Sequence, residues 1–171
     1  MDTLRTAVWH QYGAALDTLE SAVHSCPDSL WADRSQKHEY WYLVFHTLFF
    51  HDLYLSERLE GFTPPAPFTL SEVNPDGEMP PRVYTKSELL DYLEHGRRKL
   101  RASVAALTEE HAAHKKKFWT AERSELEWML YNMRHVQHHS AQLNLMLRQS
   151  IDFGAKWIGT TAHLLEEKAI G

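Results

Sequence analysis

Four stretches of the chain repeat apolar residues with the spacing of an α-helix, and this periodicity restricts the possible folds more than any other feature. The stretches span approximately residues 2–25, 35–60, 85–107 and 121–149. Pro27 ends the first stretch, and Gly61 suits the C-terminal cap of the second. Thr85 and Glu88 have the spacing of a capping box, which marks the start of the third. The pattern predicts four long helices that bury their apolar faces against one another.

A proline-rich segment, residues 61–84, separates the second stretch from the third and holds six of the seven prolines. Neither a helix nor a central strand tolerates that density of proline. Because neither flank could fold alone, we interpret the segment as a crossover connection and not a domain boundary. The expected fold class is therefore all-α: a four-helix bundle with one long Pro-rich crossover between helices 2 and 3.

The whole chain, residues 1–171, is expected to form a single domain, since 171 residues suffice for one substantial core. The bundle would take about residues 1–150, and residues 151–171 would form a C-terminal tail packed on it. This tail contains Trp157 and is expected to pack across the bundle, with a short helix as one option for about residues 161–168.

Charge and composition exclude several classes of protein. The formal net charge of −5 argues against a general nucleic-acid-binding role. The single cysteine, Cys26, excludes an intrachain disulfide and is typical of a reducing cytoplasm, where we expect the protein. No apolar stretch follows a basic N-terminus, so no signal peptide is expected. The most apolar window, residues 40–55, is too short and too polar to span a bilayer, so we expect no membrane partner.

Histidine is abundant, with 12 copies, and two of them have a spacing that suggests a metal site. His135 and His139 project from one face of a helix, about 40° apart around its axis. His46 lies in an apolar stripe of the second predicted helix and is the best candidate for a third ligand. The alternatives are a solvent-exposed pair at 135 and 139, and a core histidine at 46 bonded to some acceptor. His51 and His38 are the fallback ligands.

Three neutral imidazoles suit Zn²⁺ or Ni²⁺ better than Mg²⁺ or Ca²⁺, which prefer oxygen ligands. Three ligands also leave a coordination position open for chemistry. Nucleophile elbows, phosphate-binding loops, dinucleotide-binding glycine motifs and zinc-finger cysteine pairs are all absent, and no catalytic residue can be assigned. Four residues are candidates to orient ligands or substrate: Glu39, Asp52, Tyr131 and Gln142. Three rings are candidates for an aromatic wall: Tyr42, Phe49 and Trp128.

The run Arg134-His135-Val136-Gln137-His138-His139-Ser140-Ala141-Gln142 resembles the last-helix signature N-H-x-x-H-H-R-G-Q of the DinB-like superfamily of putative metalloenzymes. The resemblance covers about residues 1–150. It implies a four-helix bundle in which His135 and His139 bind a divalent metal together with His46 from the second helix. Ser140 and Ala141 replace the usual Arg-Gly, a departure that affects inferences about substrate contacts and not about the metal.

The resemblance also implies two functional hypotheses. Characterised members of the superfamily include transferases and isomerases that use bacillithiol, mycothiol or glutathione. This chain is thus expected to be a metal-dependent thiol S-transferase or hydrolase acting on a small molecule, with a low-molecular-weight thiol as a cosubstrate. The second hypothesis is a non-catalytic, stress-related or interaction protein in which the three-His site is structural. The superfamily commonly forms homodimers, so a homodimer is expected.

Overall fold

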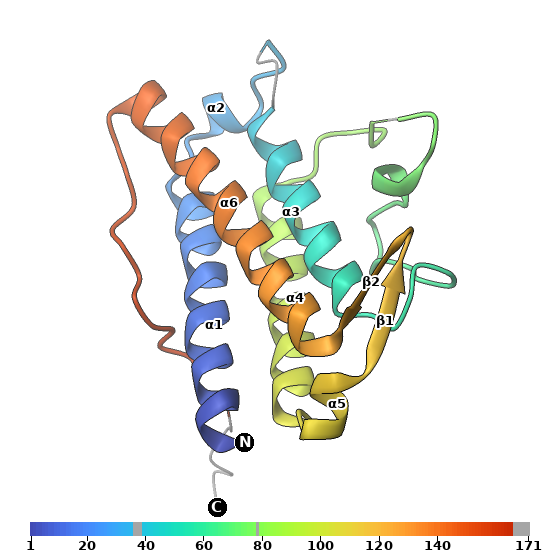
Figure 1. The fold of residues 1–171 in the computed structure, drawn as a ribbon. Helices are drawn as coiled ribbons and strands as arrows, with labels where there is room; N and C mark the ends of the chain where they lie inside the picture. The colour runs from blue at the N-terminus through green and yellow to red at the C-terminus, as the bar shows by residue number, and fades with distance from the viewer. Residues whose placement is uncertain (36–38, 78, 166–171) are drawn as a thin grey trace, which may run out of the picture.

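Four long helices dominate the computed structural model, which describes residues 1–35, 39–77 and 79–165 (Figure 1). They are α1 (Asp2–Ser25), α3 (Tyr40–Tyr54), α4 (Lys86–Ala105) and α6 (Glu125–Ile151). The shorter elements are α2 (Asp28–Trp31), the 3-10 helix η1 (Ser71–Val73), α5 (Glu109–Ala113), β1 (Lys115–Phe118) and β2 (Ala121–Ser124). The chain is thus mostly helical, which confirms the all-α class.

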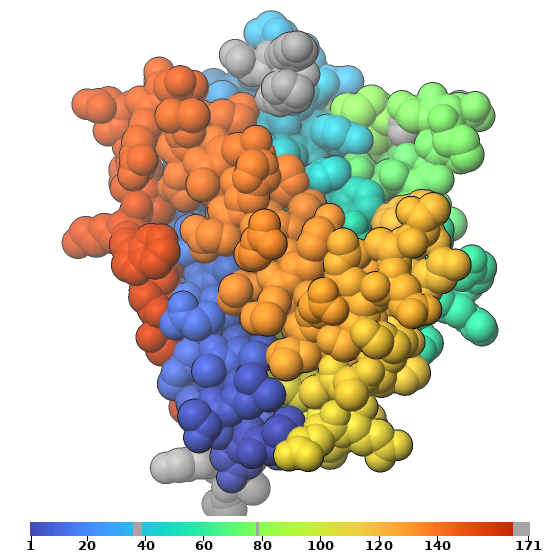
Figure 2. Space-filling view, viewed as in Figure 1, coloured from blue at the N-terminus to red at the C-terminus, as the bar shows by residue number. Residues whose placement is uncertain are grey.

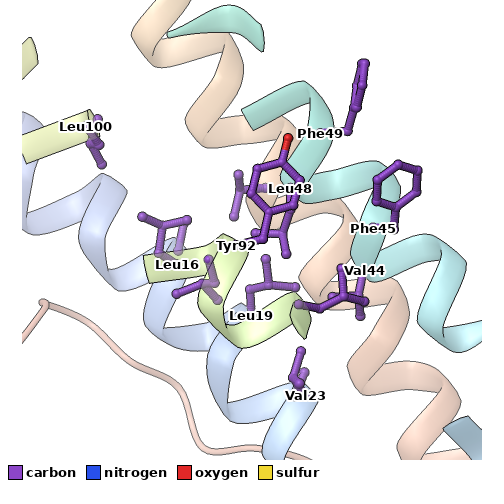
Figure 3. Packing of buried hydrophobic residues seen from close by; sticks show 14 of the residues in the cluster. Leu16, Leu19, Val23, Val44, Phe45, Leu48, Phe49, Tyr92 and Leu100 are labelled. Carbon is purple, nitrogen blue, oxygen red and sulfur yellow. The ribbon is translucent and has the colours of Figure 1, made fainter. Parts of the chain in front are cut away.

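The core lies between the long helices. Helix α1 packs against α4 and α6, and α3 packs against the same two. Figure 3 shows side chains from three of these helices in the space between them: Leu16, Leu19, Val23, Val44, Leu48, Tyr92 and Leu100. Phe45 and Phe49 project from the other side of α3, toward Phe62 and Phe68 of the connection. Burial of these apolar surfaces is the main stabilising contribution to such a fold, and it fixes α3 next to α6.

Capping boxes fix where α4 and α6 begin. Thr85 and Glu88 form the predicted capping box of α4, with the Thr85 side chain accepting a hydrogen bond from the Glu88 amide. Ser124 and Glu127 form a second capping box, at the start of α6. Helix α6 therefore begins at Glu125, four residues later than the sequence pattern indicated.

A β hairpin occupies the residues just before α6. Strands β1 and β2 pair antiparallel, with Lys115 opposite Ser124 and Phe118 opposite Ala121. Phe118 is fully buried, and the carbonyl of Lys116 accepts a hydrogen bond from Trp128 Nε1 at 3.0 Å. The hairpin is therefore anchored on the first turn of α6.

The second predicted helix is shorter than expected, because α3 ends at Tyr54 and not near residue 60. The carbonyl of Asp52, which would accept the amide of Ser56 in a continuing helix, instead accepts hydrogen bonds from Lys99 Nζ and the Ser56 hydroxyl. The Ser56 amide turns back to the carbonyl of Leu53. The predicted start at residue 35 precedes residues 36–38, which lie outside the described residues.

The chain after α6 runs back along α1 (Figure 1). The Thr161 amide donates to the carbonyl of His10. The Thr161 side chain packs directly on Gly13, where an added Cβ would lie only 2.6 Å from Thr161 Cγ2. The described part of the tail thus contacts α1, as Trp9 also donates to the carbonyl of His163, while Trp157 itself is 82% exposed. Residues 161–165 are not helical, and residues 166–168 lie outside the described residues.

Within residues 1–35, 39–77 and 79–165, every helix is too short or too polar to cross a membrane.

Candidate metal centre

The structure brings the three histidines singled out in the sequence to one place. His46 Nε2 lies 3.4 Å from His135 Nε2, which lies 3.1 Å from His139 Nε2. One ring nitrogen from each of the three lies within 4.8 Å of the others. The group could hold a metal ion, and the ligand role of each histidine stays a prediction.

Helix geometry explains the convergence. His135 and His139 are one helical turn apart on α6, so both rings project from the same side. His46 extends from α3, which packs directly against α6. The ring of Phe50, one turn further along α3, lies 4.8 Å from His46 and 5.8 Å from His135. An apolar ring thus covers one side of the cluster.

Two of the three imidazoles are oriented by acceptors on their other nitrogen. His46 Nδ1 lies 2.7 Å from a carboxylate oxygen of Glu72, which can only accept, so Nδ1–H donates. His139 Nδ1 donates in the same way to the side-chain oxygen of Gln142, also at 2.7 Å. Both tautomers leave the Nε2 lone pair directed at the cluster, the arrangement that metal-binding histidines typically show.

Burial favours the neutral form of His135 and His139. It lowers the pKa of His135 to about 3, with further lowering from the neighbouring His139 and His46. Burial also lowers the pKa of His139. Neutral imidazole is the form that binds metal ions.

The donor set fits a cation. Nε2 of His46 and of His139 carry no proton, so His135 can donate to one of them and leaves the other without a partner. His135 Nδ1 is buried and has no hydrogen-bond partner among the described residues. A borderline ion such as Zn²⁺ or Ni²⁺ would satisfy all three Nε2 lone pairs at once.

A surface pocket of about 540 Å³ adjoins the cluster, and His135 forms part of its wall. The pocket is lined along one face of α6 by Tyr131, Arg134, His135, Gln137, His138 and Ala141. A small molecule in this pocket would therefore contact one of the three histidines.

The other sequence candidates divide between the site and the core. Gln142 is at the site, through His139, and Tyr131 lines the pocket. Glu39 is instead bonded to Trp41 and Arg34. Asp52 accepts hydrogen bonds from Tyr92 and Lys99. These two acids therefore hold the fold together and lie away from the three histidines.

The expected aromatic wall is replaced by different rings. Phe49 and Trp128 are buried in the core. Tyr42 lies beside Glu72, and burial together with this carboxylate raises its pKa. The rings next to the histidines are those of Phe50 and Tyr54, the latter 6.2 Å from the ring of His135.

His51, one of the two fallback ligands, lies away from the cluster. His51 is fully buried, and its Nδ1 lies 2.8 Å from the hydroxyl of Tyr12. Its ring lies against Gly96 of α4, where a Cβ would lie 2.5 Å from His51 Cδ2. His38 lies outside the described residues.

Glu72 is the site residue that the sequence did not reveal. It lies in η1, inside the proline-rich connection, where no periodicity relates it to α3. Its side chain is only 4% exposed. An isolated acid in an irregular segment carries no spacing signal, so only the folded connection shows that it reaches His46.

A second group of potential ligands, Asp17, Glu20 and His163, also clusters. The buried guanidinium of Arg97 pairs with Asp17 at 2.5 Å and with Glu20 at 2.6 Å. Arg97 thus already neutralises these carboxylates, and the three-histidine group is the better candidate for a metal centre.

Among the comparisons with known proteins, a family model matches the chain. Neither a curated protein nor a solved structure matches the chain. The family model of the DinB superfamily matches residues 11–143, which is well over half of the chain and includes all three histidines. Mostly helical architecture and a histidine group that could hold a metal accord with that match. The chain belongs to the DinB superfamily.

Proposed function

We propose that His46, His135 and His139 hold a divalent metal ion, with Zn²⁺ or Ni²⁺ preferred, and that the protein is a metal-dependent enzyme acting on a small molecule. The reaction would be of the thiol S-transferase or hydrolase type. The observation that carries the proposal is the convergence of three Nε2 atoms, two of which, in His46 and His139, have lone pairs directed at the cluster.

When bound, a divalent ion supplies Lewis-acid chemistry, lowering the pKa of a thiol or a water molecule that it coordinates. The protein's own residues prepare the site for this role. Glu72 and Gln142 hold two imidazoles in the metal-binding tautomer. Phe50 excludes water from one side of the cluster.

Two features favour catalysis over a structural role. A three-nitrogen ligand set leaves a coordination position open, whereas structural zinc sites are closed by four protein ligands. His135 also lines a pocket large enough for a small molecule. A low-molecular-weight thiol is the proposed cosubstrate. The homodimer, the cytoplasmic location and the single-domain organisation likewise stay proposals.

Elemental analysis of the purified protein tests the metal site. We expect about one divalent ion per chain, and a large loss of metal in His46→Ala, His135→Ala and His139→Ala. His138→Ala is the matched control, because His138 lies on the same helix between two of the ligands but outside the ligand group. Equal metal content in all four variants would overturn the assignment.

Catalysis is tested separately, by measuring thiol consumption with glutathione and a panel of small electrophiles, and ester hydrolysis with a chromogenic ester. Turnover in the metal-loaded protein, abolished in His139→Ala with the circular-dichroism spectrum intact, would support the enzyme. A protein that binds metal, unfolds when the metal is chelated and turns over none of these substrates would support the non-catalytic alternative.

A further inference from the structure

We infer that the pocket beside His135 selects a small anionic molecule with a flat, apolar body. This inference rests on the proposed function, because it names the class of substrate that the same site would take. Two independent sets of residues carry it: arginines without a carboxylate partner among the described residues, and exposed aromatic rings.

The first set is cationic. Arg134 lines the pocket next to His135 and is exposed. Arg123 of β2 lies across the ring of Tyr131, with its guanidinium carbon 5.2 Å from the ring centre. Within the described residues, neither arginine forms an ion pair, although the chain carries a net charge of −5. Arg134 is the guanidinium group in the pocket wall, and Arg123 lies over the rings of Trp128 and Tyr131. A guanidinium group in the wall favours an anionic ligand, which it can bind with paired hydrogen bonds.

The second set is aromatic. Tyr131 is 37% exposed and Trp119 is 49% exposed, and the two rings lie 5.4 Å and 6.4 Å from the ring of Tyr54. Phe50 lies 6.2 Å from Trp119 and connects this group to His135. Exposed rings of this size are unfavourable in water and provide a surface on which a flat apolar group can stack.

The backbone of Trp119 supports a role for its side chain. Trp119 lies in the tight turn between β1 and β2 with a φ of 50°, a conformation that favours glycine or asparagine. A bulky residue in this conformation costs stability, and such strain is concentrated at functional sites. Helix α6 and the hairpin share one face of the molecule, shown toward the viewer in Figure 2.

Size sets the scale of the ligand. A pocket of about 540 Å³ lies within the usual range for a single small molecule. The guanidinium of Arg134 would hold the anionic group, and the ring of Tyr131 would contact the apolar body. Trp119 lines a separate pocket beside the hairpin and is linked to Tyr131 through the ring of Tyr54. Selection would therefore depend on charge at one end and on planarity at the other.

Isothermal titration calorimetry of the metal-loaded protein tests this with two probes of equal shape, 2-naphthoate and the neutral 2-naphthamide. We expect 2-naphthoate to bind at least about tenfold more tightly, since a charge-assisted hydrogen bond is stronger than a neutral one. Arg134→Gln should remove this preference with metal content unchanged, and Tyr131→Ala should weaken the binding of both probes. Arg98→Gln is the matched control, because Arg98 is an exposed arginine on α4, outside this pocket.

Equal affinity for the two probes, or equal effects of Arg134→Gln and Arg98→Gln, would overturn the inference while leaving the metal site intact. A purified protein without metal, and unable to take up Zn²⁺ or Ni²⁺, would overturn the proposed function itself. Measuring metal content and probe binding on the same samples keeps these two failures distinct.

Discussion

Glu72 determines the tautomer and the orientation of the His46 ring at the cluster. Its carboxylate accepts the Nδ1 proton of His46 while its side chain is almost entirely buried. Loss of an acceptor of this kind commonly costs about 10–100-fold in metal affinity. The connection between α3 and α4 therefore contributes directly to the proposed centre.

We expect Glu72→Gln to lower the affinity for Zn²⁺ by about tenfold or more without unfolding the protein, because an uncharged amide is a weaker acceptor for His46. Competition with a chromogenic chelator measures this affinity. Glu109→Gln, at an exposed acid that begins α5, is the control and should change nothing. Identical affinities in the two variants would show that Glu72 does not support His46.

A close approach between α3 and α4 depends on Gly96. A Cβ at this position would lie 2.5 Å from Cδ2 and 2.7 Å from Nε2 of the buried His51 ring. Alanine improves helix propensity by up to about 1 kcal/mol over glycine, whereas overpacking a core costs about 1–3 kcal/mol. The steric effect should dominate, because the ring is enclosed.

Gly96→Ala should accordingly reduce the free energy of unfolding, by on the order of 1–2 kcal/mol. Urea denaturation measures the change. The double variant Gly96→Ala/His51→Ala should show less than the sum of the single effects, since removing the ring removes the clash. If Gly96→Ala instead raised the free energy of unfolding, α3 and α4 would be able to move apart without losing stability, and the predicted clash would be contradicted.

Stability should also depend on pH through His51. Burial lowers its pKa in the folded protein to about 4, below the value of about 6.5 in an unfolded chain. The unfolded state binds the proton first as the pH falls, so stability is complete above pH 6.5 and is lost toward pH 4. The loss between pH 6.5 and pH 5 should be about 2 kcal/mol for this one group.

Urea unfolding of the metal-free protein at these two pH values tests the expectation. His135, with its pKa lowered to about 3, should add to the loss in that form. His51→Gln should reduce the dependence, because it removes one of the buried histidines whose pKa is lowered; His135 and His139 remain. A free energy of unfolding that does not change between pH 6.5 and pH 5 would contradict the account.

At the scale of single elements, α6 carries two of the three proposed ligands and begins at a capping box. Ser124 accepts the Glu127 amide, which satisfies one of the free donors of the first turn. Ser124→Ala should lower the free energy of unfolding by about 1 kcal/mol. Ser150→Ala, at an exposed serine near the other end of α6, should have little effect. The same urea experiment measures both, and equal effects would contradict a capping role.

Local geometry explains which parts of the fold and site were predictable from the sequence. The spacing of His135 and His139 fixes their shared face once α6 exists, because helix geometry is constant. The start of α6 was misplaced, although Ser124 and Glu127 have capping-box spacing that could have located it. The hairpin before it has only one buried apolar residue per strand at most, so its alternation gives little signal.

Apart from the meeting of His46 with His135 and His139, which the family resemblance implied, contacts between distant segments were beyond prediction from the sequence. Glu72 reaches His46 only through the path of an irregular connection. Trp119 and Tyr131 meet around Tyr54 only because the hairpin folds back toward α6. Such placements depend on the complete packing of the chain and not on any local periodicity.

For the molecule as a whole, the proposed ion connects α3 and α6. An ion that binds only the folded state stabilises it by about 2.7 kcal/mol when its concentration is 100 times the Kd. Chelation should therefore lower Tm, and re-addition of Zn²⁺ or Ni²⁺ should restore it. Thermal unfolding followed by circular dichroism measures this shift. His139→Ala should show no response to chelator, whereas a wild-type protein with the same Tm in both conditions would contradict an ion shared by the two helices.

The most direct test of a metal ion held between α3 and α6 is an anomalous-difference map from a crystal of the metal-loaded protein, recorded at the absorption edge of the bound element. We predict one strong peak bonded to Nε2 of His46, His135 and His139, at about 2.0–2.1 Å for zinc. A metal-loaded crystal whose peak lies elsewhere, for example beside Asp17 and Glu20, or whose three rings show no peak between them, would contradict the account.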